Sequence, residues 1–293
     1  MTLSEKLSTR LMSEGLDPRD IEDLAQRTIA EDLAGGEDVT SNATIPAEKI
    51  SSADFCARKA GTIAGASIAA AVLEVTGIDE YQFCIEEGSF VEAGVVILRA
   101  HGNTRKLLLA ERSALNFLGT LSGIATLTQR WVHEVANSNT KIRDTRKTTP
   151  LLRELEKYAV RAGGGVNHRM SLSDAALIKD NHVFASGGIV EAFQAIRAKY
   201  PEIPVEVEVD TLEQLRDVID AGADLILLDN MNLEQTRAAV AMSSGRVKLE
   251  SSGGLTLENA RAYASTGVDY LAVGALTHSA PVLDIGLDFK DGM

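Results

Sequence analysis

The feature that most constrains the fold is a regular alternation of short apolar runs and amphipathic segments in the second half of the chain. Six runs have the length and apolar content of strands: Thr140–Asp144, Ala176–Lys179, Val205–Val209, Leu225–Leu228, Val247–Glu250 and Tyr270–Val273. Helical stretches are predicted between them, near 151–160, 190–199, 212–220, 233–241 and 257–264. Strands that alternate with helices in this way form a parallel sheet, either open or wound as a barrel.

The first part of the chain has a different pattern, in which short β-prone runs alternate with glycines. A helix is expected at Asp17–Leu33, because Asp17 can cap it and Pro18 suits the first helical position. Strands are expected at 54–58, 81–85 and 95–100, a short helix at 67–75, and one or two helices over 105–136. This arrangement is typical of an α+β region.

Composition excludes several classes of protein. The chain has 29 basic and 42 acidic residues, and its net charge of −13 argues against a nucleic-acid coat or a basic membrane binder. Its two cysteines, Cys56 and Cys84, have no metal-binding spacing and exclude a disulfide scaffold. The N-terminus lacks the apolar core of a signal peptide, and no apolar stretch is long enough to span a bilayer. We therefore expect a soluble, cytoplasmic protein.

Polar residues follow the predicted strands at their carboxyl ends, which is where βα proteins bind ligands. Residues 141–179 contain nine Lys/Arg and four Asp/Glu, a local charge of +5 that leaves −18 for the rest of the chain. A basic pocket in an acidic protein predicts a small anionic ligand. The candidate contact residues in loops or at strand ends are Arg146, Lys147, His168, Arg169 and Lys179.

Two later strand ends favour phosphate. Ser251-Ser-Gly-Gly precedes a helix, and Val273-Gly-Ala follows the last strand, where barrels often bind phosphate. A plain turn is the alternative for the first motif. Glu208 and Asp229 end adjacent strands. They could bind a divalent metal, stabilise a cationic transition state, or pair with Lys179 or Arg169 in a structural network.

The histidines are harder to assign from the sequence. His182 is either a site residue or a helix cap, and the role of His278 is open. No Ser-His-Asp or Cys-His arrangement is present, so a protein nucleophile is not predicted.

Several long runs resemble the quinolinate phosphoribosyltransferase family. They include Asp144-Thr-Arg-Lys-Thr-Thr-Pro, Glu206-Val-Glu-Val-Asp, Glu250-Ser-Ser-Gly-Gly-Leu and Asp269-Tyr-Leu-Ala-Val-Gly-Ala-Leu-Thr-His. The resemblance covers nearly the whole chain. It implies transfer of phosphoribosyl from phosphoribosyl pyrophosphate to quinolinate with decarboxylation. The products would be nicotinate mononucleotide, pyrophosphate and carbon dioxide, in de novo NAD biosynthesis with Mg²⁺ as the cofactor.

The resemblance also implies an architecture and an assembly. The expected fold is α/β: an N-terminal α+β sandwich-like domain (1–114, completed by 281–293) and a C-terminal incomplete α/β, TIM-like barrel (115–280). The expected assembly is a homodimer, or a hexamer built from it, with shared active sites. A paralogue using another small acid, a silent regulatory oligomer, and a phosphate-binding barrel isomerase or aldolase are the competing hypotheses.

The residue roles implied by the resemblance fall into three groups. The substrates would contact Thr145, Arg146, Lys147, His168, Arg169 and Lys179, with Arg112 reaching across the dimer interface to a carboxylate. Lys147, Glu208 and Asp229 would be catalytic, the last two near the ribose and the metal. The 5′-phosphate would be bound by Ser252, Gly253, Gly254, Val273, Gly274, Ala275 and His278.

Overall fold

The computed structural model describes residues 2–290, and contacts divide the chain into two compact units. Unit 1 comprises Met1–Leu127, Glu154–Gly164 and Ser279–Met293, and unit 2 comprises Thr128–Arg153 and Gly165–His278. This division differs from the predicted boundaries. The 114/115 boundary falls inside one continuous helix, α5 (Thr104–Glu134), and 154–164 groups with unit 1. Residues 1 and 291–293 of the predicted N-terminal domain lie outside the described residues.

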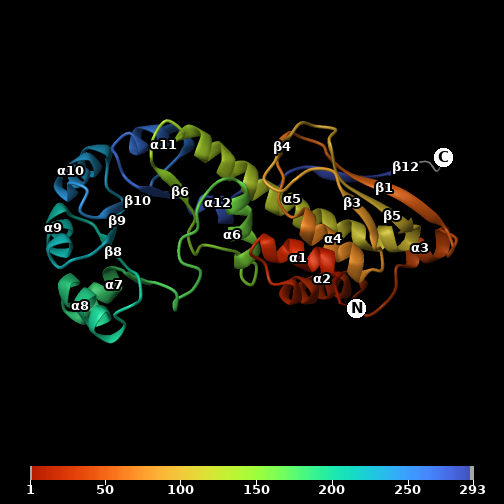
Figure 1. Ribbon diagram of the computed structural model, residues 1–293, viewed down its shortest axis with the longest axis horizontal. Coiled ribbons are helices and arrows are strands. Elements are labelled where there is room, and N and C mark those ends of the chain that lie inside the picture. The colour runs from red at the N-terminus through yellow and green to blue at the C-terminus, as the bar shows by residue number, and fades with distance from the viewer. Residues whose placement is uncertain (1, 291–293) are drawn as a thin grey trace. The chain divides into compact units, whose positions relative to one another are not determined.

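Unit 1 is built on a four-stranded antiparallel sheet with the order β12-β1-β5-β3. The last strand pairs with β1 from Ser52 to Ala57, so the end of the described chain joins a sheet formed by its first hundred residues (Figure 1). The strands of unit 1 are β1 (Ile50–Ala57), β2 (Gly61–Thr62), β3 (Glu80–Phe83), β4 (Phe90–Val91), β5 (Val96–Asn103) and β12 (Ile285–Lys290).

The helices of unit 1 supply its apolar core. Helix α2 begins at Pro18 because the Asp17 side chain accepts a hydrogen bond from the Arg19 N–H, as predicted. Helix α4 is buried over eight consecutive residues and contacts α1 and α2. The helices are α1 (Glu5–Ser13), α2 (Pro18–Leu33), α3 (Val39–Thr44), α4 (Ala66–Val75), the first part of α5, and nearly all of α6 (Arg153–Ala162).

Unit 2 contains the predicted parallel sheet, with six strands in the order β6-β11-β10-β9-β8-β7. Its two edge strands, β6 and β7, are not paired with each other in the described part of the chain, so the barrel is incomplete. The strands are β6 (Lys141–Arg143), β7 (Ala176–Ile178), β8 (Val205–Val209), β9 (Leu225–Asp229), β10 (Lys248–Ser252) and β11 (Tyr270–Ala272).

Helices α8 to α11 lie along the outer side of strands β8 to β10 (Figure 1). Capping boxes at Thr211, Asn232 and Thr256 begin three of them, two of which the sequence predicted. These caps end the preceding loops sharply and so direct the strand ends toward one edge. The helices of unit 2 are α7 (Asp180–Ser186), α8 (Ile189–Lys199), α9 (Leu212–Asp220), α10 (Leu233–Ser243), α11 (Leu257–Ala264) and α12 (Ala275–His278).

The predicted α/β class is confirmed, and α5 is a single helix. Among residues 2–290, no helix is both long enough and apolar enough to cross a membrane.

Candidate active site

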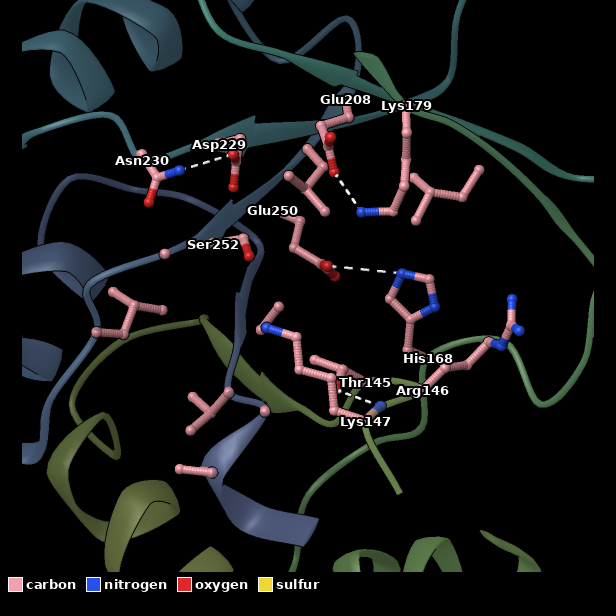
Figure 2. A pocket seen from close by; sticks show the side chains of 18 of the residues that line it. Thr145, Arg146, Lys147, His168, Lys179, Glu208, Asp229, Asn230, Glu250 and Ser252 are labelled. Carbon is pink, nitrogen blue, oxygen red and sulfur yellow. Dashed lines mark hydrogen bonds and ion pairs between the residues drawn. The ribbon is translucent and has the colours of Figure 1, made fainter. Parts of the chain in front are cut away.

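One cavity of about 710 Å³ in unit 2 is lined by fifteen of the sixteen predicted site residues (Figure 2). Thirteen of them follow or end strands of the parallel sheet, at its carboxyl edge, as expected for this architecture. The other two, His168 and Arg169, come shortly after Val166, which forms a parallel bridge with Arg143. The sixteenth, Arg112, is exposed on α5 and does not line this cavity. The fifteen are Thr145, Arg146, Lys147, His168, Arg169, Lys179, Glu208, Asp229, Ser252, Gly253, Gly254, Val273, Gly274, Ala275 and His278.

Two arginines form the strongest anion-binding feature of the cavity. The Nε atoms of Arg146 and Arg169 are buried without a hydrogen-bond partner in the described structure. Burial, and then the nearby Arg146 charge, lower the pKa of Arg169. Buried Nε–H donors without an acceptor, on two neighbouring guanidinium groups, are unfavourable unless an anion accepts from them.

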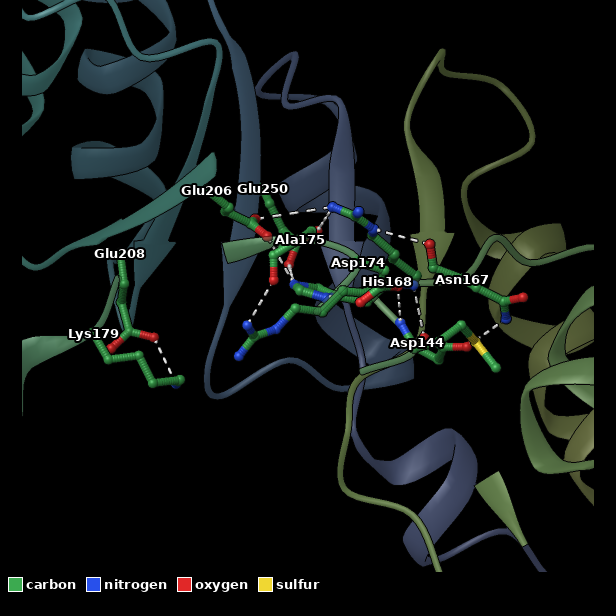
Figure 3. Close-up of polar contacts among 12 residues, drawn as sticks. Asp144, Asn167, His168, Asp174, Ala175, Lys179, Glu206, Glu208 and Glu250 are labelled. Carbon is green, nitrogen blue, oxygen red and sulfur yellow. Dashed lines mark hydrogen bonds and ion pairs between the residues drawn. The ribbon is translucent and has the colours of Figure 1, made fainter. Parts of the chain in front are cut away.

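The loop that carries Arg169 is held in place by buried hydrogen bonds (Figure 3). Asp144 accepts from the His168 N–H at 2.8 Å and from the Asn167 side-chain amide at 2.6 Å. The Arg169 guanidinium donates to the Ala175 carbonyl at 2.9 Å. The contacts of Asp144 join the end of β6 to the loop before β7. Sequence periodicity does not predict that these two segments meet.

His168 uses both ring nitrogens within the protein. Its Nδ1 accepts from the Arg169 N–H at 2.7 Å, and its Nε2 lies 2.8 Å from a carboxylate oxygen of Glu206. Since Nδ1 is an acceptor, the proton of the neutral ring is on Nε2. The resemblance implies a substrate contact for His168, but neither ring nitrogen is free for one in this arrangement.

Acidic groups lie opposite the arginines. Glu208 pairs with Lys179, with 2.9 Å between Oε2 and Nζ, so the predicted structural pairing is present. Asp229 accepts a hydrogen bond from the Asn230 side chain at 2.7 Å. Burial, and then the charge of Asp210, raise the pKa of Asp229. Its second carboxylate oxygen is therefore a candidate ligand for a cationic group.

The two glycine motifs line another part of the same cavity. Gly253 and Gly254 follow β10 with φ of +88° and +63°, a conformation that favours glycine. They precede the Thr256 cap of α11. At Gly274 a Cβ would lie 3.1 Å from Lys147 Cδ and 3.3 Å from His278 Nε2, so its absence lets these two side chains approach the backbone. Such exposed backbone suits a phosphate group.

Two polar cavity residues, Asn230 and Glu250, were missed by the sequence analysis. Asn230 follows the predicted site residue Asp229, and Glu250 begins the motif Glu250-Ser-Ser-Gly-Gly-Leu, but their neighbours were selected instead. Period two along β10 was an available signal, because it places Glu250 on the same face as Ser252. His182 has the capping role considered for it: its Nδ1 accepts from the Lys179 N–H at the start of α7.

Comparisons with known proteins identify the family. The model of the quinolinate phosphoribosyl transferase N-terminal domain matches residues 38–122, and the model of the C-terminal domain matches residues 124–288. This chain belongs to the quinolinate phosphoribosyl transferase family. The predicted family and the predicted enzyme class, a phosphoribosyltransferase, are confirmed.

Individual relatives are similar over nearly their full length. Nicotinate-nucleotide pyrophosphorylase (carboxylating) of Mycobacterium leprae (strain TN) is 53% identical over 272 residues, 91% of this chain and 96% of the relative. A probable enzyme of the same name from Bacillus subtilis (strain 168) is 44% identical over 262 residues, 88% and 89% of the two chains. The crystal structure of NadC from Streptococcus pyogenes has a TM-score of 0.89 and 39% identity, with 94% and 99% covered.

Proposed function

We propose that this protein transfers the phosphoribosyl group of phosphoribosyl pyrophosphate to quinolinate and removes one carboxyl group. The products are nicotinate mononucleotide, pyrophosphate and carbon dioxide, as in de novo NAD biosynthesis. The family membership and the names of the relatives support this reaction. Both substrates are polyanions, and the basic cavity suits them.

The observation that carries the proposal is the pair of buried Nε–H groups of Arg146 and Arg169, which have no hydrogen-bond partner in the described structure. A ligand with two adjacent carboxylates supplies an acceptor for each, and Lys147 on the same wall adds a third positive charge. A ligand with one carboxylate leaves one buried donor unsatisfied, which costs roughly 1–3 kcal/mol. The pocket therefore favours a dicarboxylate over the competing small acids.

The chemistry requires no protein nucleophile. The pyridine nitrogen forms a bond to ribose C1 while the bond from C1 to pyrophosphate breaks. Asp229 and Glu208 line the cavity and would stabilise the cationic ribosyl centre. In the quinolinate nucleotide, the bond to the carboxyl group beside the ring nitrogen breaks and leaves its electron pair on that ring carbon. The positive nitrogen stabilises this carbanion, which then takes up a proton.

Asp229 and Glu208 also fit a magnesium ion bound together with the substrate. Mg²⁺ takes oxygen ligands and needs only one or two carboxylates when waters and phosphates complete its coordination. Asp229 has an oxygen outside its bond to Asn230, whereas Lys179 already neutralises Glu208. We therefore assign Asp229 as the main ligand. The ion would offset the negative charge that builds on the pyrophosphate.

We further propose a homodimer in which Arg112 of one subunit contacts a quinolinate carboxylate in the other. Support comes from the family motif that contains Arg112 and from the exposure of its side chain on α5. An exposed guanidinium that does not line the cavity of unit 2 can act on a partner without rearrangement of its own core.

A turnover assay tests the reaction. The purified protein is given quinolinate, phosphoribosyl pyrophosphate and Mg²⁺, and nicotinate mononucleotide is measured. We expect stoichiometric nucleotide and pyrophosphate, and no turnover when nicotinate replaces quinolinate. Turnover of nicotinate or another monocarboxylate in place of quinolinate would contradict the proposal.

Subunit mixing tests the shared site. Arg112→Ala and Lys147→Ala subunits are each expected to be inactive, but a mixed dimer has one intact site and should recover part of the activity. Tagged subunits purified as mixed dimers provide the sample. Mixed dimers that form and stay inactive would contradict the role of Arg112.

A further inference from the structure

Four ionisable side chains meet at one side of the cavity, where barrel strands usually carry apolar side chains. They are Arg143 from β6, His168 from the loop before β7, Glu206 from β8 and Glu250 from β10. Figure 3 shows the last three. Two of the four, His168 and Glu250, line the cavity itself. The side chains of Glu206 and Glu250 are only 4% and 0% exposed. Buried ionisable groups are costly unless they are paired, so we examined how these four are connected.

Arg143 and His168 bridge the two carboxyl groups. One Arg143 nitrogen lies 2.7 Å from Glu250 Oε2 and 3.9 Å from Glu206 Oε1. His168 Nε2 lies 2.8 Å from Glu206 Oε2 and 3.7 Å from Glu250 Oε1. His168, Glu206 and Glu250 are close enough to hold a metal ion, but the Arg143 guanidinium already supplies the cation among them.

The cluster has more acid than base. Two ionised carboxyl groups would share one permanent cation, since His168 is neutral when its Nδ1 accepts a hydrogen bond. Asp144, at the end of β6, adds a negative charge nearby, while Tyr270 from β11 contributes only a ring against Arg143. Two carboxyl groups this close in a buried site do not both ionise.

Glu250 is the group that retains the proton. Burial, and then the charge of Glu206, raise its pKa to about 8, although the contact with Arg143 opposes the shift. A protonated Glu250 therefore leaves one negative charge fewer beside the Arg143 cation.

We propose that Glu250 is a positioning residue, held as a neutral acid so that the wall of the dicarboxylate site carries one negative charge fewer. The inference rests on the proposed function. Ionised Glu250 would repel the two substrate carboxylates above it. It would also compete with Glu206 for the His168 N–H, and His168 is bonded through Nδ1 to the backbone of Arg169. Neutral Glu250 thus avoids electrostatic repulsion of the substrate carboxylates and keeps His168 and Arg169 in position.

The pH dependence of Glu250→Gln tests this inference, because glutamine copies the shape of the neutral acid but cannot ionise. The measured quantity is kcat/KM for quinolinate at saturating phosphoribosyl pyrophosphate and Mg²⁺, from about pH 6.5 to about pH 9.5. In the wild type we expect a fall of roughly tenfold above pH 8, the effect of one charge at about 10 Å in a medium of dielectric near 20.

The variant should differ from the wild type only in the alkaline range. At pH 7 its kcat/KM should be within about twofold of the wild type, since a neutral group replaces a neutral group. Above pH 8 its kcat/KM for quinolinate should decrease much less than that of the wild type, while its KM for phosphoribosyl pyrophosphate stays unchanged. Glu206→Gln removes the charge that raises the Glu250 pKa, so it should move the alkaline fall to lower pH.

Glu14→Gln is the matched control. Glu14 lies in unit 1, and burial followed by the charge of Glu87 raises its pKa to about 7. Its substitution should leave the alkaline fall for quinolinate as in the wild type. A merely structural role for Glu250 predicts a loss at every pH and for both substrates.

Three results would overturn the inference. One is a loss of more than about tenfold in the Glu250→Gln variant at pH 7, which would mean that the ionised form is needed. Another is an alkaline fall equal to that of the wild type. If the wild type turns over no quinolinate, calorimetry of quinolinate binding over the same pH range makes the comparison. Absence of binding there would overturn the proposed function together with this inference.

Discussion

Replacing Gly253 by alanine should weaken binding of the 5′-phosphate far more than the same change at Gly254. Both glycines have a left-handed backbone, which costs an L-residue roughly 1–2 kcal/mol. At Gly254 nothing lies within 4 Å of the added Cβ, so this strain is the whole effect. At Gly253 the Cβ would overlap the Asn230 side-chain oxygen and lie 2.7 Å from its Cγ.

The clash at Gly253 adds a second cost. Asn230 must rotate away, which breaks its 2.7 Å hydrogen bond to Asp229. A hydrogen bond to a charged group contributes roughly 1.5–3 kcal/mol. The expected totals are therefore roughly 2.5–5 kcal/mol for Gly253→Ala and roughly 1–2 kcal/mol for Gly254→Ala. The difference corresponds to about 10- to 150-fold in affinity.

The affinity of nicotinate mononucleotide, measured by calorimetry, reports this difference directly. Thermal melting of both variants should show that unit 2 remains folded, because the glycines lie in a loop outside the apolar core. Equal affinities for the two variants would refute the steric argument. A loss of quinolinate affinity with unchanged nucleotide affinity would refute the assignment of this loop to phosphate.

Two further predictions concern single side chains. Arg146→Ala should weaken quinolinate binding by roughly 1.5–3 kcal/mol in calorimetry, because a charged hydrogen bond is lost. Arg153→Ala is its control, since Arg153 bonds only Thr148 and the Met170 carbonyl in the described structure. Unchanged quinolinate affinity in Arg146→Ala would exclude a contact role for Arg146. Glu14→Gln should remove a loss of stability with rising pH. The folded protein holds a proton on Glu14 up to about pH 7 that the unfolded chain releases near the ordinary pKa of 4.5, so wild-type stability falls through this window and is level above it. The raised pKa of Glu14 corresponds to about 3 kcal/mol of unfolding free energy before solvent screening and to about half of that after it. Urea titrations at the two ends of this pH window measure the change. Unfolding free energies that depend on pH in the same way in the variant and the wild type would contradict the prediction.

Much of the fold was predictable because its signals are local. The apolar runs that became β8, β9 and β10 (residues 205–209, 225–229 and 248–252), and the caps Thr211 and Thr256, depend only on neighbouring residues. The carboxyl ends of parallel strands meet at one edge, so the polar residues after each strand could be assigned to one site. That rule is why fifteen of the sixteen candidates line one cavity.

The division of the chain into units was less predictable. Segment 154–164 groups with unit 1 although both of its neighbours in sequence belong to unit 2. Its amphipathic pattern predicts a helix but not the surface on which the apolar side packs, because that choice depends on contacts with distant residues. For the same reason the pairing of β12 with β1 follows from the structure, whereas the sequence supplied it only through the family resemblance.

The sequence by itself therefore determined the strands of the parallel sheet, the family and the positive character of the pocket, since these are read from periodicity and from motifs of a few residues. Only the tertiary structure decided how the charges are used. Arg143 and Glu250 are 107 positions apart in the chain, yet their side chains meet at 2.7 Å where the Glu250 side chain is fully buried. Burial together with a second carboxyl group keeps the proton on Glu250, and neither condition is written in its sequence neighbours. A charge acts through its distances and its surroundings, and both are set by the fold.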